Sequence, residues 1–142
     1  MGPAALVAVQ EDALCQRVHS GDADAIVEAS ARALAGSLFC QQTILNILGA
    51  RLVAGTIGVG DFILSAEPLS RLAAATGDPY EQRRWASVLD VKAHELRRLD
   101  SRNASITAHA ECAILLNRLI DQGDDEAASL LALFAPDMDP DA

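Results

Sequence analysis

Hydrophobic and small residues recur with helical spacing along residues 78–122. The positions concerned are Trp85, Leu89, Leu96, Leu99, Ile106, Ala110, Ala113 and Ile120. Asp78 can cap a helix and Pro79 suits its first turn, and the next helix-breaking residue is Gly123. The pattern therefore predicts one long helix, about 65 Å in length if it is uninterrupted.

A second series with the same spacing runs through residues 24–53. Its apolar positions are Val27, Ala31, Leu34, Leu38, Leu45, Leu48 and Leu52, and Gln41 takes the polar position among them. This series predicts a second long helix, which ends before a glycine-rich turn at residues 55–60. We expect the two long helices to lie antiparallel.

Shorter elements complete the chain. A first helix is expected over residues 3–18, with residues 1–21 able to act as a mobile arm, and Pro68 begins another short helix. A last helix is expected over residues 124–134, followed by a disordered acidic tail at 136–142. The predicted fold class is all-α: a bundle of four to five helices in a single domain, residues 1–142, dominated by the long antiparallel pair and assembled as a helical oligomer.

The stretch Asp100-Ser101-Arg102-Asn103 is the weakest part of the longest predicted helix. The side chains of Asp, Ser and Asn compete with the helix for backbone hydrogen bonds. A continuous helix and a break at this point are both compatible with the sequence.

Charge narrows the choice of partner. The chain of 142 residues carries a formal charge of −9, which disfavours binding to nucleic acid or to an anionic membrane. Six of the eleven basic residues fall close together: Arg83, Arg84, Lys92, Arg97, Arg98 and Arg102. The sequence leaves open whether this basic face binds a ligand, faces solvent or receives the acidic C-terminal segment.

The cysteines and the longest uncharged run bear on location. Cys15, Cys40 and Cys112 have no paired spacing, which suits a reducing compartment. The uncharged run at residues 33–50 contains the polar residues Gln41, Gln42, Thr43 and Asn46 and is a poor membrane span. We therefore predict a cytoplasmic protein with no membrane partner.

His94 is the first candidate for chemistry. The residues His94-Glu95-Leu96-Arg97 resemble the phosphoacceptor box of sensor histidine kinases, although Arg98-Leu99 stands where that box usually continues with a proline. The resemblance implies that His94 accepts a phosphoryl group and passes it to an aspartate. A histidine phosphotransfer protein using His94 is thus one alternative function; an ordinary surface histidine is the other interpretation.

Arg102 and His109 form a second candidate. Arg102-Asn103, followed by five residues and His109, resembles the active-site motif of HEPN ribonucleases, which are small helical dimers. The resemblance implies that Arg102 stabilises charge on the phosphate while His109 transfers a proton. A HEPN-like ribonuclease is therefore a second alternative function.

Metal chemistry is weakly indicated. His109 and Cys112 could chelate one ion, but no further ligands of matching spacing accompany them. We predict no metal site and no cofactor.

The function that the pattern favours is non-enzymatic. We expect an interaction, adaptor or assembly protein that associates with itself, as a dimer or larger oligomer, and docks to another protein through apolar helix faces. The residues expected to carry these contacts are Leu34, Leu38, Leu45, Leu48, Leu52, Leu130, Leu131 and Phe134. The last helix either provides a docking element or covers the protein's own core.

Overall fold

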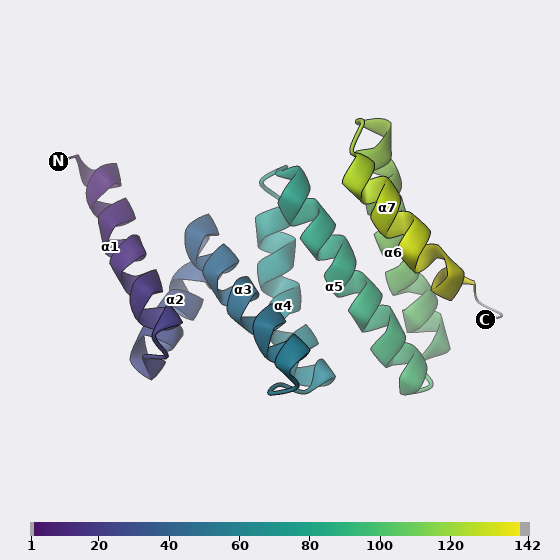
Figure 1. Ribbon diagram of the computed structural model, residues 1–142, viewed down its shortest axis with the longest axis horizontal. Helices are drawn as coiled ribbons and strands as arrows, with labels where there is room; N and C mark the ends of the chain where they lie inside the picture. Colours follow the sequence, from purple (N-terminus) through teal and green to yellow (C-terminus); the bar gives the residue numbers. More distant parts are fainter. Residues whose placement is uncertain (1, 140–142) are drawn as a thin grey trace. The chain divides into compact units, whose positions relative to one another are not determined.

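A computed structural model describes residues 2–139 and confirms the all-α class (Figure 1). Within this range the elements are α1 (Pro3–His19), α2 (Ala23–Leu34), α3 (Leu38–Ala54), α4 (Val59–Ala74), α5 (Pro79–Arg98), α6 (Arg102–Asp121), α7 (Asp125–Phe134) and the 3₁₀ helix η1 (Ala135–Met138). Where the sequence predicted one domain, the contacts group these helices into two compact units, Met1–Gly58 and Val59–Ala142. Each unit is described by itself. In the described residues, no helix is both long enough and apolar enough to cross a bilayer.

The helix predicted over residues 24–53 is divided into α2 and α3. Gly36 has a φ of 113°, a conformation that glycine adopts without steric cost. Ser37 then caps α3, because its Oγ accepts a hydrogen bond from the Cys40 N–H at 3.2 Å. The helical spacing continues across this turn, so the pattern alone did not reveal the break.

The longest predicted helix is also divided, at the weak point that the sequence indicated. Asp100 has a φ of 62°, and the N–H of Ser101 bonds to the carbonyl of Leu96 at 2.8 Å. This tight reversal folds α5 and α6 into a helical hairpin (Figure 1). Of the two alternatives that the sequence left open at this point, the structure has the break. Neither of the long helices expected over residues 24–53 and 78–122 is continuous.

In the first unit, α1, α2 and α3 pack against one another around small side chains. The buried residues include Leu14, Cys15, Val18, Ala25, Ala29, Ala33, Leu45 and Leu48. The buried Gln41 donates from Nε2 to the carbonyl of Ala33 at 2.9 Å, which explains a polar residue in the apolar series of α3. The second half of α1 is thus packed, although residues 2–10 are exposed, where the sequence predicted a mobile arm over residues 1–21.

In the second unit, α4 packs on α5, α5 on α6, and α6 on α7. The large buried residues include Phe62, Leu69, Trp85, Leu89, Leu116 and Leu119. The buried face of α6 differs from the predicted one, since Ser105 and His109 lie inside while Ile106 and Ala110 are exposed. Ser105 is accommodated because its Oγ donates to the carbonyl of Ala93 at 2.7 Å.

The C-terminal segment packs on the hairpin. Residues Ala135–Met138 form η1, and Arg97 donates from Nη2 to the carbonyl oxygens of Asp137 and Asp139, both at 3.2 Å. The prediction of a disordered tail is wrong for residues 136–139, because the basic α5 holds them; residues 140–142 lie outside the described range. At the other end of α5, Arg83 pairs with Asp124 at 2.5 Å. Arg83 and Arg97 of the basic face therefore bind the acidic C-terminal segment of the chain.

Candidate functional site

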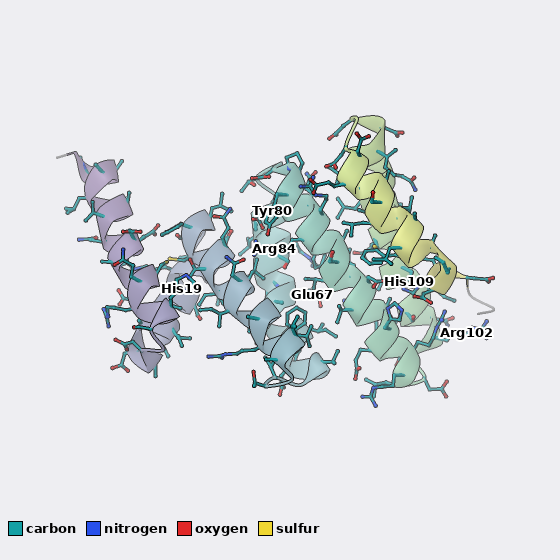
Figure 2. The ribbon with its side chains drawn as sticks, in the orientation of Figure 1. His19, Glu67, Tyr80, Arg84, Arg102 and His109 are labelled. Carbon is teal, nitrogen blue, oxygen red and sulfur yellow. The ribbon has the colours of Figure 1, made fainter. Side chains whose placement is uncertain are left out.

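Two histidines and two carboxylates meet where α5, α6 and η1 come together. Asp90 and His94 lie one turn apart on α5, His109 lies on α6, and Asp137 lies on η1. Figure 2 labels His109 in this region of α6. One ligand-type atom from each of Asp90, His94 and His109 lies within 4.8 Å of the others. We call Asp90, His94, His109 and Asp137 together the histidine cluster.

His94 forms the exposed side of the histidine cluster. Its Nδ1 lies 2.7 Å from the carbonyl oxygen of Asp90 and its Nε2 lies 3.2 Å from Oδ2 of Asp137. A carbonyl oxygen and an ionised carboxylate only accept hydrogen bonds, so these two contacts together favour the doubly protonated, cationic ring. Partial burial alone would lower the pKa of His94, but the carbonyl bond and the charges of Asp90 and Asp137 outweigh it and raise this pKa.

His109 forms the buried side. Its side chain is 5% exposed, and its ring packs edge-on against the ring of His94 with the centroids 5.4 Å apart. Burial lowers the pKa of His109, so that the ring is held neutral, whereas burial raises the pKa of Asp90.

Two polar atoms of the histidine cluster lack a hydrogen-bond partner among the described residues. They are Nε2 of His109 and Oδ1 of Asp90, which face each other at 3.6 Å, beyond hydrogen-bond length. Buried polar atoms are nearly always paired, and each unpaired one costs about 1–3 kcal/mol. This pair is therefore the feature of the site that most requires an explanation.

The structure places the predicted phosphoacceptor His94 on the surface of α5, as the resemblance requires, but among negative charges. The carboxylate of Asp137 lies against Nε2, and Nδ1 is engaged by the carbonyl oxygen of Asp90. Arg97 is engaged with the backbone of η1, and Arg98 pairs with Glu95 at 2.5 Å. An incoming phosphoryl group would meet like charge at this ring.

Arg102 and His109, the predicted ribonuclease pair, differ in accessibility. Arg102 is the first residue of α6 and is exposed, whereas His109 is buried against α5 (Figure 2). A proton-transferring histidine has to reach the ribose, and the ring of His109 faces Asp90 and His94 instead. The geometry does not gather the two residues into one open site.

Cys112, which the sequence paired with His109 as a possible chelator, has a structural contact of its own. Its thiol donates to the carbonyl of Ala86 at 3.2 Å, and burial together with the charge of Asp90 raises its pKa to about 12. The sequence had missed Asp90 and Asp137. The i, i+4 spacing of Asp90 and His94 could have indicated the first, but no local signal connects Asp137 to residues more than forty positions earlier.

The predicted interaction residues separate into two groups. Leu45 and Leu48 are buried in the first unit, whereas Leu34 is 60% exposed and Leu38 and Leu52 are half-buried. Leu130, Leu131 and Phe134 on α7 are also half-buried.

Comparison of the chain with known protein families, with characterised proteins and with solved structures finds no match. Any functional conclusion therefore rests on the chain's own geometry.

Proposed function

We propose that the protein is a non-enzymatic interaction or assembly protein that associates with itself and docks to a second protein through apolar helix faces. The observation that carries this proposal is the composition of α7. Four large apolar residues, Leu130, Leu131, Leu133 and Phe134, lie within ten positions, and none of them is buried. Leu133 is 68% exposed. Burying such a side chain against a partner stabilises a complex by about 1.5–3 kcal/mol.

The surface beside α7 adds to this support. Leu130 borders an open groove of about 280 Å³ that is also lined by Tyr80, Ser87 and two arginines of α5. The ring of Tyr80 is 54% exposed, with the guanidinium of Arg84 4.9 Å from its centre. Tyrosine and arginine beside an apolar side chain are the residue types that contribute most to protein interfaces.

Apolar exposure also occurs on α1. Leu6, Val7 and Val9 are each about half exposed, at 49%, 48% and 53%, on the part of α1 that has no buried residue. An apolar face in each of the two units suits a protein that contacts more than one surface, whether these belong to copies of itself or to a different protein.

The proposal is tested by the mass of the protein in solution. We expect light scattering over a range of concentrations to show a dimer or larger oligomer of the 14.9 kDa chain. Leu133→Asp should shift the assembly toward monomer while the helical circular dichroism stays unchanged, because this residue is not part of the core.

Ala128→Asp is the matched control. It adds the same charge to an exposed position of α7, on a different side of the helix from Leu133. Two results together would contradict the proposal. The protein would be a monomer at all concentrations, and Leu133→Asp would capture the same proteins as wild type.

A further inference from the structure

We propose that the histidine cluster binds one divalent transition-metal ion of the zinc class, with Asp90, His94 and His109 as ligands. This site goes beyond the proposed interaction role and does not depend on it. Two imidazole nitrogens and a carboxylate oxygen are donors that zinc accepts, whereas magnesium and calcium require oxygen ligands alone.

The spacing of the donor atoms is the first argument. Ligands at about 2.0–2.2 Å from a tetrahedral zinc ion lie about 3.3–3.6 Å from one another. In the histidine cluster, Nε2 of His109 lies 3.6 Å from Oδ1 of Asp90, and one ligand-type atom from each of Asp90, His94 and His109 lies within 4.8 Å of the others. The separation of 3.6 Å is longer than a hydrogen bond and matches the edge of a coordination tetrahedron.

The unpaired atoms are the second argument. Nε2 of His109 and Oδ1 of Asp90 are buried and have no hydrogen-bond partner in residues 2–139. The two atoms face each other at 3.6 Å, a separation within ion-pair range but too long for a hydrogen bond. A cation between them would satisfy both atoms, and this would remove the cost of burying them.

The orientation of His94 is the third argument. Its Nδ1–H donates to the carbonyl of Asp90, so its Nε2 is the nitrogen available to a metal. A hydrogen bond from the second ring nitrogen to a backbone carbonyl is the usual support for a metal-binding histidine. Asp90 therefore holds the imidazole in place through its backbone and offers a ligand through its side chain.

The three ligands come from two elements, which gives the metal a structural consequence. Asp90 and His94 belong to α5, and His109 belongs to α6. A bound ion would therefore join the two arms of the α5–α6 hairpin, and one tetrahedral position would remain for a water molecule.

The test uses the untagged full-length chain, stripped of metal with a chelator. Isothermal titration with Zn²⁺ should show one site per chain, and native mass spectrometry should show the addition of one zinc ion. Co²⁺ should give the strong visible absorption of a four-coordinate ion, and excess Mg²⁺ should not displace it.

His94→Gln changes an exposed residue and should leave the fold intact. It should weaken Zn²⁺ binding at least tenfold, which corresponds to about 1.4 kcal/mol. His19→Gln is the matched control, because His19 is an exposed histidine in the other unit and should bind as wild type. His109→Gln can be interpreted only if its circular dichroism matches wild type.

The absence of stoichiometric Zn²⁺ binding would overturn the proposal. Equal losses in His94→Gln and His19→Gln would also overturn it, because they would indicate nonspecific binding by surface histidines.

Discussion

Ser105 and Ala93 join the two arms of the hairpin by a hydrogen bond of 2.7 Å, donated from the Oγ of one to the backbone carbonyl of the other. The hydroxyl is buried at a position where the helical pattern would place an apolar side chain. This contact fixes which face of α6 packs against α5.

Removal of that contact should destabilise the second unit. Ser105→Ala is expected to lower the free energy of unfolding by about 1 kcal/mol, the usual contribution of one intramolecular hydrogen bond. Urea denaturation followed by the fluorescence of Trp85 measures the change. Ser101→Ala is the control, because Ser101 is exposed and its side chain makes no cap hydrogen bond. Equal losses in the two variants would contradict the interpretation.

The reversal at Asp100 predicts opposite effects for two substitutions. With φ at 62°, Asp100→Gly should leave the free energy of unfolding unchanged or raise it by up to about 1 kcal/mol, because glycine adopts this conformation without strain. Asp100→Val should lower it by about 1–2 kcal/mol, since a β-branched residue is strained there. Thermal unfolding of the two variants distinguishes the outcomes, and a valine variant as stable as wild type would show that α5 and α6 do not depend on this turn.

Leu48 and Leu34 occur in the same apolar series but should behave differently. Leu48 is 7% exposed, so Leu48→Ala is expected to cost about 2–5 kcal/mol in unfolding free energy through loss of core packing. Leu34 is 60% exposed, so Leu34→Ala should change that energy by no more than about 0.5 kcal/mol. Guanidinium denaturation provides the comparison, and similar losses would mean that Leu34 is covered in solution.

Asp124 predicts a pH dependence of α7. Its carboxylate accepts a hydrogen bond from the Ala127 N–H at 3.0 Å and pairs with Arg83, and these contacts lower the pKa of Asp124 below the model-peptide value of 3.8. A lowered pKa means that the stabilisation is complete above pH 3.8 and is lost as the pH falls through the lower folded value. Hydrogen exchange of the α7 amides should accelerate over that range.

Two substitutions separate the cap from the charge of Asp124. Asp124→Asn keeps a side chain that can cap the helix, so α7 should form but lose most of its dependence on acid pH. Asp124→Ala removes both contributions and should increase exchange at every pH. If acid accelerates exchange equally in wild type and in Asp124→Asn, another group is responsible.

The sequence predicted the fold class and several helix ends because these depend on local chemistry. Asp78 caps α5 through the Tyr80 N–H at 2.9 Å, and Pro79 is the first residue of that helix, as expected. The break at Asp100 was recognised as a weak point for the same reason. The turn at Gly36 was missed because the apolar series continues on both sides of it.

The histidine cluster could not have been predicted in full, because it depends on the register of one helix against another. An apolar series assigns the inner face of α6 to Ile106 and Ala110, yet polar Ser105 and His109 occupy it. Only the position of α5 shows that these two residues meet Ala93 and Asp90. The contribution of Asp137 additionally requires knowledge of how η1 folds back.

The buried cysteines provide each unit with an internal probe of its own opening. Cys15 and Cys40 lie inside the first unit and Cys112 lies inside the second, and all three thiols are free. A thiol reagent reaches them only after the surrounding helices separate. The reaction rate of each thiol therefore measures how often its own unit opens. The two units can be followed independently, with no label added to the protein beforehand.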